Sequence, residues 1–246
     1  MEKKKNAVEV CFSPKLFPDI ITNENYIVVI SDILRATTSM CVAFEHGVKE
    51  IIPVAGLDEI KRMKEDGYLI AAERDGQALD FADFGNSAFN FMTPVVKDKT
   101  IAYSTTNGTQ AIEMAAKTAD GVVIGSFINL DAVVDYLFEQ DKNVVILCSG
   151  WKNRFSLEDA FYAGALIDRL MLNDDFSMDC DASTAALDLW HTGQEDIHYY
   201  IEKAEHRNRL KRLGQDDVIE LTFSLNISRV VPVLVEGKLI DISKSI

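Results

Sequence analysis

The stretch TIAYSTTNGTQAIEMAAKTADGVVIGSFINL (100–130) decides the fold of this 246-residue chain. Residues 100–105 and 121–126 are continuous apolar runs, and residues 108–119 between them have the spacing of an amphipathic helix. Continuous rather than alternating apolar runs are typical of parallel strands that helices cover on both faces. The stretch therefore predicts a strand, a helix and a second parallel strand, which is the repeating unit of an α/β fold.

The same pattern extends outward in both directions. Strands are expected at 7–12, 26–31, 50–55, 68–76 and 143–149, and helices at 34–47, 57–67, 130–140, 157–172, 182–192 and 194–213. Residues 77–98 are expected to be irregular and leave open a boundary between two lobes around a cleft. The last strand, 229–240, is expected at a sheet edge because Pro232 lacks a backbone N–H. We predict one three-layer α/β/α domain over 1–246 with a largely parallel sheet.

The composition narrows the class of partner. The chain has 48% hydrophobic and 26% charged residues, as soluble globular proteins do, and a net charge of −14. An acidic protein is repelled by phosphate backbones, so nucleic acid is not expected, whereas a small anion can still bind where a metal sets the local field. No apolar run reaches the roughly 18–20 residues of a membrane helix, and the charged start MEKKKN lacks the apolar stretch of a signal peptide. We expect a cytoplasmic protein with reduced cysteines and no membrane partner, and a homodimer stays open.

Four strand-to-helix junctions carry small polar or charged residues: SDILRATT (31–38), STTNGT (104–109), GSFIN (125–129) and CSGWKNRFSLED (148–159). The carboxyl ends of parallel strands are where open α/β sheets bind ligands, and helix N-termini there offer free N–H groups to anions. The alternative is that these residues only cap helices. The candidate substrate-binding residues at these junctions are Thr37, Thr38, Thr105, Thr106, Asn107, Gly108, Thr109, Ser126 and Asn129.

Charged residues at two of the junctions suggest catalysis. Asp32 stands where a strand ends, and Arg35 follows three residues later. A carboxylate suits a hard divalent cation, and a guanidinium fork suits a phosphate. Glu158 and Asp159 open a helix, where pairing with the helix dipole would also explain them. These four are the candidate catalytic residues of a metal-assisted phosphate site, and the three carboxylates are candidate metal ligands.

Two further observations bear on the chemistry. Cys148 and Arg154 have the Cys-x5-Arg spacing of cysteine phosphatases, which leaves open a metal-independent cysteine mechanism, although Leu147 replaces the usual histidine. A non-catalytic protein that binds phosphate esters also stays open. His198 and His206 lie eight residues apart on one face of an expected basic helix, and we interpret this face as solvated rather than as a metal site.

Together the motifs resemble the 2-phosphosulfolactate phosphatase family of coenzyme M biosynthesis. The matching segments are SDILRATTS (31–39), AERDG (72–76), DFGNSAFNF (83–91), STTNGTQA (104–111), GSFIN (125–129) and CSGW with SLEDAFYAGAL (148–166). They follow the family's order over about 30–170. The chain departs at Ala88, where the family usually has proline, and at Ser149, where it usually has alanine.

The resemblance implies a three-layer α/β/α phosphatase that depends on Mg²⁺. Its implied reaction is the hydrolysis of (2R)-2-phospho-3-sulfolactate to 3-sulfolactate and phosphate. The resemblance adds Asn86 and Ser87 of the FGNS segment as substrate-binding residues and Glu73 of AERDG as a further metal ligand. On this reading Asp32 and one or both of Glu158 and Asp159 bind the metal, Glu73 is a further candidate ligand, and Arg35 grips the phosphate.

Overall fold

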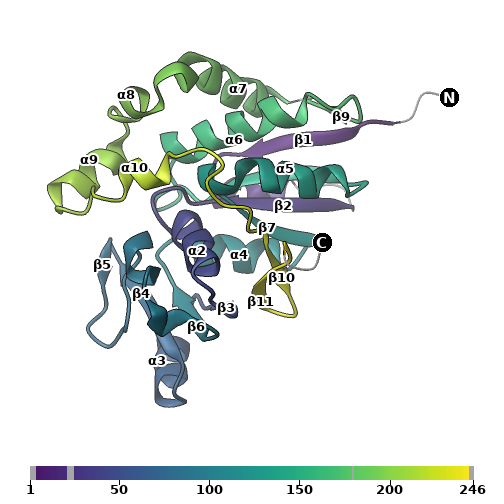
Figure 1. The fold of residues 1–246 in the computed structure, drawn as a ribbon. Helices are drawn as coiled ribbons and strands as arrows, with labels where there is room; N and C mark the ends of the chain where they lie inside the picture. Colours follow the sequence, from purple (N-terminus) through teal and green to yellow (C-terminus); the bar gives the residue numbers. More distant parts are fainter. Residues whose placement is uncertain (1–3, 21–24, 179, 244–246) are drawn as a thin grey trace.

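A mixed sheet of eleven strands runs through the residues that this computed structural model describes, which are 4–20, 25–178 and 180–243. The strands lie in the order β5-β4-β6-β3-β11-β10-β7-β2-β8-β1-β9 (Figure 1). Their bounds are β1 Asn6–Cys11, β2 Tyr26–Ser31, β3 Glu50–Pro53, β4 Leu69–Arg74, β5 Gln77–Ala78, β6 Thr100–Ser104, β7 Gly121–Gly125, β8 Asn143–Cys148, β9 Phe176–Ser177, β10 Pro232–Val235 and β11 Lys238–Asp241.

Helices cover both faces of this sheet. Their bounds are α1 Phe17–Ile20, α2 Ala36–Glu45, α3 Leu57–Glu65, α4 Gly108–Ala115, α5 Leu130–Phe138, α6 Leu157–Leu170, α7 Asp181–Gly193, α8 Ile197–Ile201, α9 Glu205–Arg212 and α10 Ile219–Thr222. In Figure 1, α6 and α7 pack side by side next to β1, whereas α2 and α4 lie across the sheet from them. None of the helices in the described part of the chain has the length and apolar character needed to cross a bilayer.

The central strand β2 shows why the apolar runs are continuous. Its residues are all buried, and successive side chains enter opposite cores. Ile27 and Val29 pack with α5, α6 and α7, whereas Val28 and Ile30 pack with α2 and α4. A strand with a helix layer on each face needs apolar side chains at every position. The α/β fold class and the largely parallel sheet are therefore confirmed.

The segment 229–240 does not form an edge strand, and that prediction is wrong. It forms the hairpin β10–β11, which lies inside the sheet and joins its two parallel halves. Val233 pairs antiparallel with Val123 of β7, and Leu239 pairs antiparallel with Ile51 of β3. Pro232 is tolerated because it is the first residue of its strand, where a missing N–H costs the ladder least.

Candidate active site

Two of the four candidate catalytic residues, Asp32 and Arg35, lie with three other candidate site residues at the carboxyl ends of β2, β4 and β6, whereas Glu158 lines an adjoining hollow. Asp32 directly follows β2, and Arg35 stands immediately before α2. Glu73 is the second-last residue of β4, and Thr106 and Asn107 follow β6. All five line one cleft, together with Asn86 from the loop that follows β5. Three of the four strand-to-helix junctions reach this cleft, namely 31–38, 104–109 and, through Trp151, 148–159.

Asp32 accepts fewer hydrogen bonds from the described residues than Glu73 or Asp159 does. It is 7% exposed, and its Oδ1 accepts one long hydrogen bond, 3.4 Å, from the N–H of Ala36. A Cβ atom placed on Gly108 would come within 2.9 Å of Oδ2, so only glycine lets the strand-to-helix turn approach so closely. Burial raises the pKa of Asp32 to about 6, the nearby positive charge of His206 opposes this, and Glu73 and Glu158 add to it.

Arg35 is the buried cation of the cleft. It is 6% exposed, and its Nη2 donates to the carbonyl of Gly76 at 3.1 Å. Burial lowers the pKa of Arg35, and the negative charge of Glu73 opposes that shift. The guanidinium of Arg35 thus lines the same cleft as the buried carboxylates of Asp32 and Glu73.

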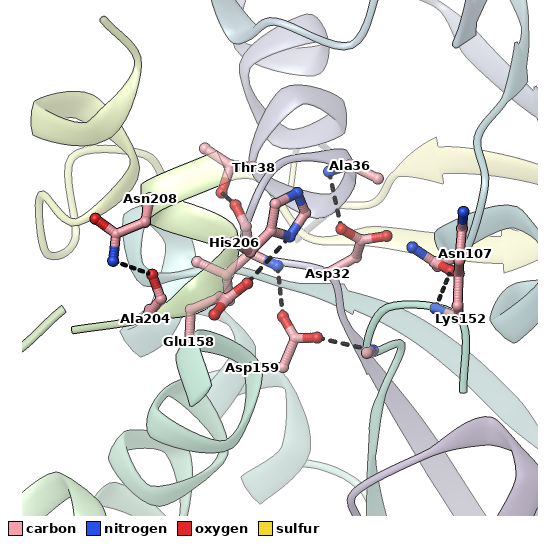
Figure 2. Close-up of polar contacts among 12 residues, drawn as sticks. Asp32, Ala36, Thr38, Asn107, Lys152, Glu158, Asp159, Ala204, His206 and Asn208 are labelled. Atoms are coloured by element: carbon pink, nitrogen blue, oxygen red, sulfur yellow. Dashed lines mark hydrogen bonds and ion pairs between the residues drawn. The ribbon is translucent and has the colours of Figure 1, made fainter. Parts of the chain in front are cut away.

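Glu73 and Asp159 use both of their oxygens to hold loops in place. The Oε1 of Glu73 accepts from the N–H and hydroxyl of Thr106 at 2.7 and 2.9 Å, and its Oε2 accepts from the N–H of Gly76 at 2.6 Å. Asp159 accepts from the N–H groups of Ile33 and Gly150, each at 2.9 Å (Figure 2). Burial, and then the charge of Glu158, raises the pKa of Asp159. These two carboxylates fix the strand-end loops against one another.

His206 and Arg209 of α9 also belong to the cleft, and the interpretation of His206 as a solvated residue is wrong. The Nδ1 of His206 lies 3.2 Å from Oε1 of the buried Glu158, and Figure 2 shows the ring between Asp32 and Glu158. Arg209 donates to the carbonyl of Asp75 and lies over the Trp151 ring. No strand precedes α9, so a search of strand-to-helix junctions does not find these residues. Their spacing of three on one helix face is the available signal.

Several candidate substrate-binding residues lie beneath the cleft instead of lining it. Thr37 accepts from the N–H of Asp32, and Thr38 bonds to Ser126. The hydrogen-bonding groups of the buried threonines and of the GSFIN junction are engaged within the protein, so these residues support the loops. They are Thr37, Thr38, Thr105, Thr109, Ser126 and Asn129. Ser87 lines a neighbouring hollow that it shares with Asn86 and Arg35.

Cys148 is not placed to act on a ligand in the cleft. It ends β8, is fully buried in the apolar core, and burial raises its pKa well above the ordinary value. Arg154, the partner that a cysteine phosphatase would need, is exposed and lines a different hollow. The geometry therefore disfavours a thiolate nucleophile, because a buried neutral thiol is a poor one.

The described residues offer no preformed cluster of metal ligands. Across 4–20, 25–178 and 180–243, no three histidine, cysteine, aspartate or glutamate side chains gather closely enough to hold an ion. The carboxylates nearest to such a role are Asp32 and Glu158. Neither the Oδ2 of Asp32 nor the Oε2 of Glu158 accepts a hydrogen bond from these residues. Both side chains are buried, at 7% and 2% exposure.

Comparison with known proteins adds a family to this geometry. The sequence model of 2-phosphosulpholactate phosphatase matches residues 11–237. A protein named "Probable 2-phosphosulfolactate phosphatase" from Clostridium novyi is 35% identical over 85% of this chain and 89% of its own length. A protein of the same name from Caldanaerobacter subterraneus is 34% identical over 85% of this chain and 88% of its own length. One of the same name from Prochlorococcus marinus is 37% identical over 77% of this chain and 80% of its own length. The matches confirm the resemblance based on the strand-end motifs.

Proposed function

The chain belongs to the 2-phosphosulfolactate phosphatase family and is a phosphoric monoester hydrolase, and from this premise we propose its reaction and cofactor. The reaction is the Mg²⁺-dependent hydrolysis of (2R)-2-phospho-3-sulfolactate to 3-sulfolactate and phosphate. The observation that carries the proposal is the buried Asp32 beside the buried Arg35 in a cleft at the strand ends. A carboxylate for a cation and a guanidinium for a phosphate are the two groups that metal-assisted phosphoryl transfer requires.

Mg²⁺ fits the carboxylates in this cleft and in the hollow that adjoins it. It commonly takes only one or two protein carboxylates and completes its shell with waters and phosphate oxygens, so a cluster of three ligands is not required. Asp32 and Glu158 would hold it, since each has a buried oxygen that no other described group engages. Glu73 and Asp159 would stay in their loop contacts. When bound, the ion neutralises phosphoryl oxygens and lowers the pKa of a coordinated water.

The protein's own groups supply binding and a proton. Arg35 would bind phosphoryl oxygens through its planar fork, and Thr106 and Asn107 would offer further donors along the cleft. Glu158 holds the Nδ1 of His206, so the Nε2 of the protonated ring would carry the proton for the leaving oxygen. As water attacks phosphorus, the ester P–O bond breaks, the leaving alkoxide would take that proton, and a proton lost by the attacking water would return to the ring.

A phosphate-release assay tests the proposal. Phosphate should appear from 2-phospho-3-sulfolactate with Mg²⁺, and EDTA should stop its release. Activity that survives EDTA would instead favour the cysteine mechanism through Cys148 and Arg154. Tight binding of the ester without phosphate release would favour a non-catalytic binding protein.

A further inference from the structure

A second hollow adjoins the cleft between α9 and the loop 151–157, and we name it the side pocket. Its volume is about 140 Å³, against about 20 Å³ for the cleft at Asp32. Trp151, His206 and Arg209 line both hollows, so the two meet at these residues. A molecule whose phosphate lies at Asp32 and Arg35 can therefore extend into the side pocket.

The walls of the side pocket suit an apolar ring. Trp151, Phe155 and Leu157 line it. Phe155 is 53% exposed although it packs edge-to-face on Phe12, with 5.3 Å between the ring centroids. The volume is close to that of an engineered cavity of about 150 Å³ that binds benzene, and is several times the roughly 30 Å³ share of one water. A sulfomethyl group would leave most of these apolar walls uncovered.

A buried hydroxyl in the side pocket lacks a hydrogen-bond partner within the described part of the chain. Ser156 precedes the 14-residue helix α6 and is 7% exposed. Its Oγ makes no hydrogen bond to any residue that the structure describes, not even the usual capping bond to the first turn of the helix. A buried polar atom without a partner destabilises the folded state, so its presence beside a cavity points to a polar atom of a ligand.

Arginines outnumber carboxylates in the side pocket, where Arg154, Arg209 and Arg212 stand against Glu158 and Glu205. Arg154 and Arg212 line it, both are exposed, and neither forms an ion pair with a described residue. Arg209 lies over the face of Trp151, with 4.6 Å between the guanidinium carbon and the ring centroid. In a chain of net charge −14, a hollow in which three arginines outnumber two glutamates favours a ligand with an acidic group.

We propose that the side pocket selects the non-reacting part of the substrate, and that the chain also hydrolyses phosphate esters of 2-hydroxy acids with a hydroxylated aryl side chain. The inference rests on the proposed phosphatase reaction. The ring lies among Trp151, Phe155 and Leu157, its hydroxyl reaches Ser156, and the carboxylate of the hydroxy acid faces the arginines. The reacting P–O bond stays at Asp32 and Arg35.

The experiment compares three esters that differ only at carbon 3 of the hydroxy acid. They are 2-phospholactate, 2-phospho-3-sulfolactate and 2-phospho-3-(4-hydroxyphenyl)lactate, assayed by phosphate release with the full chain and Mg²⁺. We expect kcat/KM for the aryl ester to exceed that for 2-phospholactate by tenfold or more. Phosphate release from 2-phospho-3-sulfolactate with no gain for the aryl ester overturns the side-pocket inference and leaves the proposed function standing. Failure to release phosphate from any ester overturns the proposed function itself.

Two variants distinguish the pocket from a general effect of aromatic residues. Phe155→Ala removes one wall and should reduce the ratio of aryl-ester to phospholactate kcat/KM by about tenfold. Tyr199→Ala is the matched control, because Tyr199 is 76% exposed on α8 and lines none of these hollows. The control should leave the ratio unchanged. An unchanged ratio in Phe155→Ala contradicts the inference.

Discussion

Replacing Asp32 by asparagine should remove most of the activity and at the same time stabilise the metal-free protein. The amide keeps the shape of the side chain but loses the charge that a hard cation favours. It also removes a buried charge that the fold compensates poorly. Burial raises the pKa of Asp32 from 3.8 to about 6, and about two pKa units correspond to about 3 kcal/mol of lost stability at neutral pH.

The pH dependence of this effect has a definite sign. The folded protein keeps the Asp32 proton to a higher pH than the unfolded chain does. Between pH of about 4 and about 6 the folded state therefore binds more protons, and its stability falls as the pH rises. The advantage of Asp32→Asn over the parent should thus be absent below about pH 4 and reach its full size above about pH 6.

Thermal and urea unfolding in EDTA across this pH range measure the difference. For a chain of this length, about 3 kcal/mol corresponds to roughly 6–12 °C in Tm. Asp188→Asn, at an exposed position of α7, is the matched control and should change little. Added Mg²⁺ should stabilise the parent but not Asp32→Asn. A variant that is less stable than the parent at pH 8, or that keeps normal Mg²⁺-dependent turnover, would refute the reasoning.

Three further substitutions test Arg35 and His206 of the cleft and Cys148 of the core. Arg35→Lys keeps the charge but loses the planar fork, so kcat/KM should fall by a factor that corresponds to about 1–3 kcal/mol of lost transition-state binding. Kinetics equal to those of the parent would show that Arg35 does not bind the phosphate. Cys148→Ser should keep Mg²⁺-dependent activity within about tenfold of the parent, or roughly 1.4 kcal/mol. Complete loss of activity, together with a thiophosphate trapped on the parent, would support the cysteine mechanism. His206→Gln should slow hydrolysis of alkyl phosphates by about a hundredfold but affect p-nitrophenyl phosphate far less, because that leaving group needs no proton, and equal losses would contradict a proton-donating His206.

The sequence predicted those features that depend on short-range patterns. The strand at 26–31 matches β2 because a doubly covered strand is apolar at every position. The place of β10 could not be predicted, because its pairing with Val123 depends on residues more than a hundred positions away. His206 was missed for a related reason. The helix that carries it is polar, and only the tertiary fold brings that helix over the strand ends.

The hairpin β10–β11 also has a consequence for how the chain assembles during its synthesis. Residues 232–241 leave the ribosome after all the other strands of this sheet, yet they lie between β7 and β3 and join the two parallel halves of the sheet. Each half can pair its own strands earlier, but β3 and β7 present open edges until the hairpin arrives. A ribosome stalled shortly before this segment would therefore hold a nascent chain with two unpaired strand edges, and such edges bind other chains.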